Sequence, residues 1–319
     1  MIPALVLTAG HATRLRPLSL VRAKAALPVG GEPLARRILR QLASAGVTDA
    51  VLNLHHLPVS VASRIGDGSD VGVRVRYSWE SPQVLGSAGG PRKALGLLGS
   101  STFLILNGDT LTDLDLPALV DAHARSGALV TMAVVRNTQP ERYGGVTADE
   151  DGRFTGVVLR GSTTPSWHFV GVQVVEADAF AAVSEDTPAE SIRTVYPALT
   201  ESRRDAVRIH PCTTSFLDIG TPADYVASCR TMAPPSASFI ERGARVTVAP
   251  SAHVRECVAW DDVEIGAGAT VERGILTDGV TVPPDTQWSD VILRRADLGP
   301  GDAADTRIGD LLATPLVLA

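Results

Sequence analysis

Residues 4–17 read Ala-Leu-Val-Leu-Thr-Ala-Gly-His-Ala-Thr-Arg-Leu-Arg-Pro, and this stretch decides the fold. Its apolar start, Ala4–Leu7, predicts a buried strand that runs into a loop of small residues. Short side chains let backbone N–H groups approach an anion, and Arg14 and Lys24 supply two cations that can face a polyphosphate. We therefore expect a strand followed by a phosphate-binding loop. On spacing alone, a strand, a turn and a solvated basic loop is the alternative.

Length and composition bound the class of protein. The 319 residues suffice for one large domain and a smaller one. Apolar residues make up 45%, charged residues 20% and the net charge is −6, so no nucleic-acid surface is indicated and a phosphate site must be built locally. No stretch approaches the about 18 apolar residues of a membrane helix, and residues 1–9 are too short for a secretion signal. We expect a cytoplasmic protein with a small-molecule phosphate ligand.

The three cysteines indicate neither a disulfide framework nor a zinc site. Cys212, Cys229 and Cys257 are odd in number, widely spaced and without a Cys-x-x-Cys pair. We expect buried or half-buried thiols.

Short aliphatic runs alternate with helical patterns from residue 1 to about residue 230. A helix is expected to begin at Pro33 and to stop at Gly46, and another to span Leu116–Ser126. The expected strands are 4–7, 50–54, 73–77, 102–106, 130–135, 157–159 and 170–175. The alternation predicts an α/β fold with a mostly parallel sheet covered on both faces. Such sheets bind ligands at the carboxyl ends of their strands.

The pattern changes after Pro234-Pro235-Ser236, which reads as a linker, so we expect one domain over 1–233 and a tail over 234–319. Apolar residues in the tail recur every six positions, and the phase breaks twice. They are Val248, Val254, Trp260, Ile265, Val271, Val282 and Trp288. A period of six predicts a short left-handed β-helix of about two coils, serving as a lid or an oligomer contact. An irregular β-rich tail is the alternative.

Two aspartates supply the acidic half of the chemistry. Asp109 follows a predicted buried strand in Asn107-Gly108-Asp109, and Asp218 stands between apolar residues and a turn. Two carboxylates that converge on a phosphate site would hold Mg²⁺ and offset the charge of a nucleoside triphosphate. The plainer interpretation of each is a turn residue or a helix cap.

A second glycine-rich loop, Gly86-Ser87-Ala88-Gly89-Gly90-Pro91, leads into a helix expected over Pro91–Leu98. Such a loop can simply turn the chain. Beside a phosphate loop it can instead let backbone amides contact the edge of a nucleobase, because no side chain obstructs the approach.

Taken in order, these motifs resemble those of the sugar-1-phosphate nucleotidyltransferases, or NDP-sugar pyrophosphorylases. The phosphate loop, the glycine-rich loop, Asn-Gly-Asp, Tyr143-Gly144-Gly145-Val146, Asp218–Pro222 and the hexapeptide tail follow one another over essentially the whole chain. The resemblance implies a Rossmann-like catalytic domain with a short left-handed β-helix. It also implies a reaction in which a nucleoside triphosphate and a sugar 1-phosphate give an NDP-sugar and pyrophosphate, with Mg²⁺.

The resemblance implies a role for each matching residue. Arg14 would stabilise the departing pyrophosphate, Lys24 would contact phosphate near the reacting centre, and Asp109 and Asp218 would hold the metal, so Arg14, Lys24 and Asp109 are the catalytic set. The other nucleotide contacts are expected from Leu7, Ala9, Gly10, His11, Ala12, Thr13, Gly86, Ser87 and Gly89. The sugar phosphate is expected to meet Gly145, Arg160, Phe169, Gly171 and Glu190.

The chain also departs from the family pattern. The family usually has glycine at Ala12 and proline at Ala23; alanine is tolerated at position 12 if its φ stays negative. Relatives carry Glu-Lys-Pro at residues 159–161, where this chain has Leu-Arg-Gly, and asparagine in place of Phe169. Arg160 keeps a cation for the sugar phosphate. We expect a less polar sugar pocket, unless neighbours such as His168 supply polar groups.

These departures leave the substrate open. At Phe169 the chain resembles the bacterial branch of the family that acts on N-acetylmuramate 1-phosphate with UTP. At Glu190-Ser191-Ile192 and in the glycine-rich loop it looks closer to the mannose- or heptose-1-phosphate guanylyltransferases. The sequence favours GTP with a mannose- or heptose-type, modified or cyclitol phosphate. A uridylyltransferase for an N-acetylated sugar and a non-catalytic ligand-sensing relative are alternatives. An acyltransferase tail is less favoured, because His253 is its one histidine.

Overall fold

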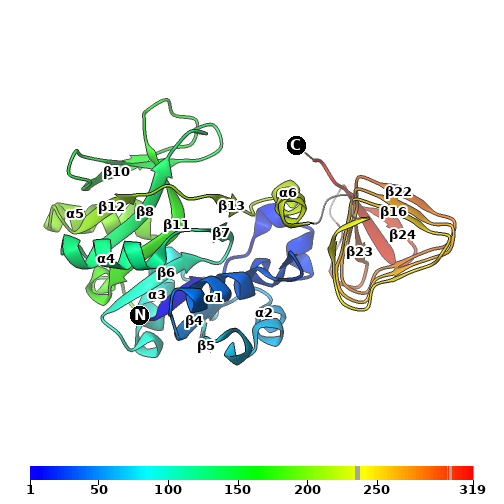
Figure 1. Cartoon of the computed structure of the whole chain (residues 1–319), viewed down its shortest axis with the longest axis horizontal. Helices are drawn as coiled ribbons and strands as arrows, with labels where there is room; N and C mark the ends of the chain where they lie inside the picture. The colour runs from blue at the N-terminus through cyan, green and yellow to red at the C-terminus, as the bar shows by residue number, and fades with distance from the viewer. Residues whose placement is uncertain (234–237, 300, 302–303, 319) are drawn as a thin grey trace. The chain divides into compact units, whose positions relative to one another are not determined.

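The computed structural model describes residues 1–233, 238–299, 301 and 304–318 (Figure 1). The expected linker, Pro234-Pro235-Ser236, lies outside the described residues. The chain packs into two compact units that do not follow chain order. The first unit holds Met1–Gly10 and Ala35–Leu217, and the second holds His11–Leu34 and Asp218–Ala319.

A mixed β-sheet forms the centre of the first unit. Its main path runs β10-β9-β11-β6-β1-β4-β5, and β8 joins β11 to β12. The strands are β1 (Ala4–Leu7), β4 (Asp49–Leu54), β5 (Arg74–Trp79), β6 (Thr102–Asn107), β8 (Val130–Arg136), β9 (Gly145–Ala148), β10 (Phe154–Val158), β11 (Trp167–Glu176) and β12 (Val207–Pro211). Each expected strand overlaps one of these. The β6-β1-β4-β5 part is parallel, as predicted.

The antiparallel strand β11 separates β6 from β8 and makes the sheet mixed. Its pairing with β8 shifts register between Phe169 and Gln173, where Gly171 has a φ of 81°. The left-handed backbone conformation at this bulge favours glycine, because a residue with a Cβ would be strained there. β6 and β8 run in the same direction, since each is antiparallel to β11, so their carboxyl ends share one edge of the sheet.

Helices cover the sheet. α3 packs against β1 and β4, α4 against β8 and β11, and α5 against β10 and β12. The helices are α1 (Leu34–Ser44), α2 (Pro58–Ile65), α3 (Gly86–Leu98), α4 (Leu116–Ser126), α5 (Tyr196–Ser202) and α6 (Pro222–Met232). The single-turn segments are η1 (Thr13–Leu15), η2 (Leu18–Leu20), η3 (Lys24–Ala26), η4 (Ser69–Val71), η5 (Ala177–Phe180) and the π-helix η6 (Ser191–Val195). α4 has the predicted bounds, and Gly46, with φ 81°, follows α1 as expected.

The prediction for α3 was wrong at its start. The helix begins at Gly86 and contains Pro91, whereas the sequence suggested a loop up to that proline. The first turn is held from outside the helix: Ala88 N donates to Ala189 O at 2.9 Å. Pro91 is the sixth residue of α3, beyond its first turn, so the helix lacks the hydrogen bond that an N–H there would donate to Ser87 O.

The second unit contains the predicted left-handed β-helix (Figure 1). Its three faces are the strand stacks β14-β17-β20-β23, β15-β18-β21 and β16-β19-β22. The strands are β14 (Phe239–Arg242), β15 (Thr247–Val248), β16 (His253–Arg255), β17 (Cys257–Ala259), β18 (Glu264–Ile265), β19 (Thr270–Glu272), β20 (Ile275–Leu276), β21 (Thr281–Val282), β22 (Gln287–Ser289) and β23 (Val291–Arg295). β25 (Leu311–Pro315) pairs antiparallel with β23, and β24 (Thr306–Ile308) pairs antiparallel with β25.

Each coil is one residue shorter than three hexapeptides. Val248 pairs with Ile265 and Ile265 with Val282, and equivalent side chains bond across 17 residues. This explains why the six-residue phase broke twice in the sequence. The expectation of about two coils was too low, because each face stacks at least three strands.

Two further pairs of strands are short. β2 (Pro28–Val29) and β3 (Glu32–Pro33) pair in the second unit, and β7 (Thr110–Thr112) pairs with β13 (Phe216–Asp218). Cys212 is half-buried and Cys229 and Cys257 are buried, as predicted, and none of the three forms a disulfide. Among the described residues, no helix is both long and apolar enough to cross a membrane.

Candidate active site

The carboxyl ends of β1 and β6 lie side by side in the first unit. Leu7 is in register with Asn107, and Gly108 N donates to Leu7 O at 2.9 Å. A Cβ at Gly108 would lie only 2.5 Å from Leu7 O, so the close crossing requires glycine. Asp109 therefore emerges at the expected edge of the sheet. It is partly exposed, and Thr110 Oγ1 donates to its Oδ1 at 3.2 Å.

A buried polar network supports this edge. Thr8 N donates to Asn53 Oδ1 at 2.6 Å, and Asn53 Nδ2 donates to Glu80 Oε1 at 2.7 Å. Glu80 Oε2 accepts from Leu85 N at 2.7 Å, just before α3. Buried polar groups need such partners because unpaired ones are costly. Sequence reasoning missed Asn53 and Glu80; the available signal was a polar residue near the end of each apolar run.

The glycine-rich start of α3 is packed against residues 187–190. A Cβ at Gly86 would lie 2.7 Å from Ala189 O, and one at Gly89 would overlap Thr187 O. Gly86 and Gly89 therefore have no room for a side chain, because they pack against this segment. Ser87 Oγ donates to Glu190 Oε2 at 3.1 Å, which brings together a residue expected at the nucleotide and one expected at the sugar phosphate.

Ser87 also holds the π-helix η6, since its Oγ accepts from Ser191 N at 2.8 Å. π-turns are rare and are often found at functional sites. No sequence pattern indicated this one.

Gly171 packs against the Asn-Gly-Asp turn. A Cβ built on it would lie 3.0 Å from Asn107 Nδ2, so it has little room for a side chain. Phe169, two residues earlier, is partly buried, pairs with Val134 and packs against the core cluster of the sheet. The structure therefore places Gly171, rather than Phe169, against the turn that carries Asp109.

Gly145 and Arg160 lie around the β9-β10 pair. A Cβ at Gly145 would overlap Ser166 Oγ, so glycine is required by packing there. Arg160 lies in the exposed turn after β10, and a Cβ at Gly144 would lie 3.5 Å from its backbone nitrogen. The Arg160 backbone and the Tyr-Gly-Gly segment are thus neighbours.

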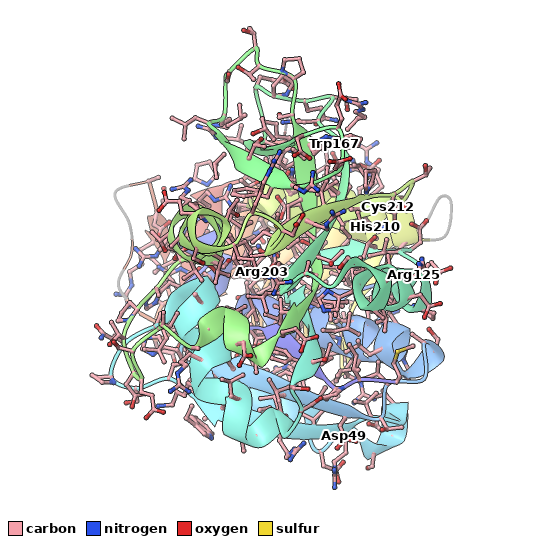
Figure 2. All side chains as sticks on the ribbon, turned by 90° about the vertical axis from the view of Figure 1, so that its left-hand side faces the viewer. Asp49, Arg125, Trp167, Arg203, His210 and Cys212 are labelled. Carbon is pink, nitrogen blue, oxygen red and sulfur yellow. The ribbon has the colours of Figure 1, made fainter. Side chains whose placement is uncertain are left out.

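An aromatic cavity of about 400 Å³ lies at the carboxyl ends of β8 and β12. The rings of His168, Tyr143 and Phe216 contact one another: the His168 centroid lies 4.3 Å from that of Tyr143 and 4.9 Å from that of Phe216, and the latter two are 5.9 Å apart. Burial lowers the pKa of His168. Cys212 also lines the cavity, and Figure 2 labels it beside His210 at the end of β12. Tyr143 belongs to a motif recognised in the sequence, and His168 was named there as a possible polar neighbour of the sugar.

The wall of this cavity includes a stacked cation. The Arg136 guanidinium lies 4.1 Å over the ring of Trp167, which Figure 2 also labels. Cation–π stacking orients Arg136 at the end of β8. The cavity therefore combines aromatic surfaces with a fixed positive charge.

In the second unit, the conformation expected for Ala12 in the phosphate loop was wrong. Ala12 has φ 48° and ψ 46°, so its φ is positive rather than negative. Leu15 N donates to Ala12 O at 3.0 Å, which starts the turn η1. An L-residue in this left-handed region costs roughly 1–2 kcal/mol. The loop therefore holds Ala12 in a strained conformation that suits the family's usual glycine.

Arg14 lies beside the segment that follows Asp218. A Cβ at Gly220 would lie 3.3 Å from Arg14 Nη1 and 3.2 Å from Asp224 Oδ2. His11, Thr13 and Arg14 are exposed in this loop, and Lys24 in η3 is half-buried.

Neither aspartate caps the helix that follows it. Thr221 is the N-cap of α6, with Asp224 completing a capping box, and Asp115 caps α4. The helix-cap interpretation of Asp109 and Asp218 is therefore wrong, whereas the turn interpretation holds for Asp109, which lies in the turn between β6 and β7. Among the described residues, no three His, Cys, Asp or Glu side chains cluster as a metal site. Carboxylates are nevertheless the oxygen ligands that Mg²⁺ accepts together with phosphate and water.

The mixed sheet with loops at its carboxyl edge and the hexapeptide β-helix are the two parts that the resemblance to the nucleotidyltransferases implied. Residues 3–233 match the family described as Nucleotidyl transferase, and residues 237–289 match the one described as GlmU-like, C-terminal hexapeptide. The chain belongs to the nucleotidyl transferase family, and the protein is a nucleotidyltransferase.

Three known proteins illustrate the similarity. The mannose-1-phosphate guanylyltransferase of Mycobacterium tuberculosis is 30% identical over 292 residues, which are 88% of this chain and 81% of that protein. The N-acetylmuramate alpha-1-phosphate uridylyltransferase of Neisseria meningitidis serogroup B is 33% identical over 229 residues, 68% of this chain and 93% of that one. The crystal structure of HddC from Yersinia pseudotuberculosis has a TM-score of 0.64 at 22% identity, over 72% of this chain and 99% of that one.

Proposed function

We propose that the protein is a guanylyltransferase that joins GTP to a mannose- or heptose-type sugar 1-phosphate, or to a related modified or cyclitol phosphate. One observation carries this proposal: the relative named mannose-1-phosphate guanylyltransferase aligns with 88% of the chain, tail included. We propose a catalytic domain over residues 1–233 and the β-helix tail over 234–319.

The proposed reaction needs positioning and charge neutralisation more than proton transfer. A sugar-phosphate oxygen attacks the α-phosphorus of GTP and forms a new P–O bond. The bond between the α-phosphorus and the bridging oxygen breaks, and pyrophosphate leaves with the electron pair. Because the attacking oxygen is already anionic, no general base is required. Arg14 would stabilise the leaving pyrophosphate, and Lys24 would contact phosphate near the reacting atom.

Asp109 and Asp218 are the proposed ligands of Mg²⁺. Their oxygen donors suit this ion, and neither carboxylate caps the helix that follows it. When bound, the ion would supply Lewis-acid neutralisation of the phosphates.

The remaining assignments follow the loops. Leu7 and Ala9 to Thr13 would contact the triphosphate. Gly86, Ser87 and Gly89 would contact the base, and Gly145, Arg160, Phe169, Gly171 and Glu190 the sugar phosphate. The Ser87–Glu190 hydrogen bond supports a shared contribution of these two residues.

A pyrophosphate-release screen tests the proposal. The purified full chain with Mg²⁺ is offered each of four nucleoside triphosphates against glucose, mannose, heptose, N-acetylhexosamine and cyclitol phosphates. We expect release with GTP and a mannose- or heptose-type phosphate. Asp109→Asn and Asp218→Asn serve as folded, inactive controls. If no pair releases pyrophosphate, the enzymatic proposal fails and a ligand-sensing role gains support.

A second candidate is a uridylyltransferase that acts on an N-acetylated sugar 1-phosphate. The aromatic cavity beside Tyr143 favours it, because its apolar surfaces suit a bulky substituent. The 33% identity to an N-acetylmuramate alpha-1-phosphate uridylyltransferase gives independent support. Turnover in the same screen with UTP and an N-acetylhexosamine phosphate, but not with GTP, would select this candidate.

A further inference from the structure

The loop that carries Arg14 and Lys24 belongs to the same compact unit as the β-helix. Residues 11–34 pack with Asp218–Ala319, although the chain between them belongs to the other unit. The side chain that joins loop and β-helix most directly is Arg22, two residues before Lys24. Its side chain is only 3% exposed.

The Arg22 guanidinium is held by two carboxylates of successive coils. Its Nε donates to Asp278 Oδ2 at 2.7 Å, and its Nη2 donates to Asp261 Oδ2 at 2.6 Å and also to Asp278 Oδ1. Asp261 and Asp278 stand 17 residues apart, at equivalent positions of the coil, and Asp261 N donates to Asp278 Oδ1 at 3.2 Å. The planar fork of arginine suits this paired contact, which a lysine cannot reproduce.

Aromatic groups close the Arg22 site from another side. The guanidinium lies 4.9 Å from the ring centre of Trp260, which is fully buried. Trp260 Nε1 donates to the Tyr225 hydroxyl at 2.9 Å, and that hydroxyl donates to Pro28 O at 2.8 Å. Burial disfavours the charge on Arg22, but the hydrogen bonds and charges of the two aspartates outweigh it and raise the pKa. Arg22 is therefore a fixed cation.

A third carboxylate holds the far end of the loop. Glu241, in β14, is 4% exposed and accepts from Gly30 N at 2.6 Å and from Gly31 N at 2.9 Å. A buried carboxylate that accepts two backbone N–H groups fixes the turn between β2 and β3. Lys24 thus lies between two anchors, and Arg14 precedes the first.

We propose that Arg22 and Glu241 are positioning residues, through which the first coils of the β-helix hold the loop bearing Arg14 and Lys24 in its catalytic conformation. The inference rests on the proposed function for its activity readout. The physical reason is that a loop whose anchors are removed samples more conformations. Displacement of catalytic groups by about 1 Å can lower a rate about 100-fold.

Arg22→Gln in the full chain tests the anchor. We expect kcat for pyrophosphate release to fall about tenfold or more, with a smaller change in KM, because charge stabilisation in the transition state depends on the loop geometry. Amide hydrogen exchange of residues 11–34 should become faster. Arg22→Lys should recover only part of both losses. All measurements are made well below the thermal midpoint of the variant.

Arg245→Gln is the matched control. Arg245 also pairs with an aspartate of the next coil, Asp262, but both side chains are exposed and neither belongs to the loop. Its kcat and its exchange in residues 11–34 should equal those of the wild type.

Asp278→Asn gives an independent route if Arg22→Gln does not fold. It removes the carboxylate charge that accepts two hydrogen bonds from the Arg22 guanidinium, so it should lower kcat. The effect on kcat of the two substitutions combined should be smaller than the sum of their separate effects. An active wild type with unchanged kcat and loop exchange in Arg22→Gln and Asp278→Asn would overturn the proposal, even if their stability fell. If the wild type releases no pyrophosphate with any pair, the proposed function fails instead. The exchange comparison then still decides whether Arg22 and Asp278 hold the loop.

Discussion

Two loops of this enzyme are both expected to contact the nucleotide, and they are held in different ways. The phosphate loop, residues 11–34, is fixed by charged side chains of its own unit, with Arg22 between two aspartates and Glu241 on two backbone amides. The glycine-rich turn, residues 86–90, is fixed by backbone packed on backbone, with Gly86 and Gly89 against residues 187–189.

The difference predicts what each loop tolerates. A charge-held loop keeps room around its functional side chains, so Arg14 is exposed and can be replaced without disturbing packing. A turn packed backbone on backbone has no room for even a methyl group. Substitutions should therefore separate catalysis from stability in the phosphate loop and should damage both together in the glycine-rich turn.

Arg14→Ala should have the largest effect. Removal of one preorganised donor is expected to cost about 2–4 kcal/mol of transition-state stabilisation, or roughly 30- to 1,000-fold in kcat. The thermal midpoint should not change, because the side chain is exposed. Arg16→Ala, an exposed cation of the same loop, is the control and should stay near wild-type activity. A normal rate for Arg14→Ala would remove its role at the leaving group.

Gly89→Ala should destabilise the fold and lower nucleotide affinity together. The new Cβ would overlap Thr187 O, and overpacking of this kind typically costs about 1–3 kcal/mol. Gly96→Ala, in the same helix but with nothing within 4 Å of its Cβ, should instead stabilise by up to about 1 kcal/mol. Urea unfolding measures both. Equal effects of the two variants would contradict the packing account.

The sheet edge was the part of the site that the sequence predicted well. Buried parallel strands read as apolar runs, so Ala4–Leu7 and the run before Asn107 were recognisable, and strand ends in one parallel sheet must meet. The hexapeptide spacing likewise revealed the β-helix, because each coil repeats its apolar contacts.

What the sequence did not predict depends on partners distant in the chain. Arg22 and Asp278 are separated by 256 positions, and nothing local marks either as a buried ion pair. Glu80 was not singled out in the sequence, and α3 was expected to begin only at Pro91, because the hydrogen bond from Ala88 to Ala189 is a tertiary contact. The positive φ of Ala12 was not predicted either, because alanine rarely adopts a positive φ.

Ala12→Gly should stabilise the phosphate loop modestly. Relief of the left-handed strain, roughly 1–2 kcal/mol, is offset by roughly 0.4–1 kcal/mol of added freedom in the unfolded chain, which leaves a gain between about 0 and about 1.6 kcal/mol. Ala124→Gly, at an exposed position inside α4, should change stability in the opposite direction by about 1 kcal/mol. Thermal unfolding compares them. Destabilisation by Ala12→Gly would show that the backbone there is not strained.

The smallest expected effect is the pH dependence of stability that His168, in the aromatic cavity of the first unit, confers. Burial lowers the pKa of His168 below its ordinary value of 6.5, so the unfolded chain binds more protons than the folded chain as the pH falls through that range. The free energy of unfolding should therefore decrease as the pH falls, and His168→Phe should reduce that slope. Urea unfolding at about pH 7.5 and about pH 5.5 measures it. His210, whose pKa is lowered by burial and by Arg125, should leave a residual slope. An undiminished slope in His168→Phe would show that His168 does not control stability here.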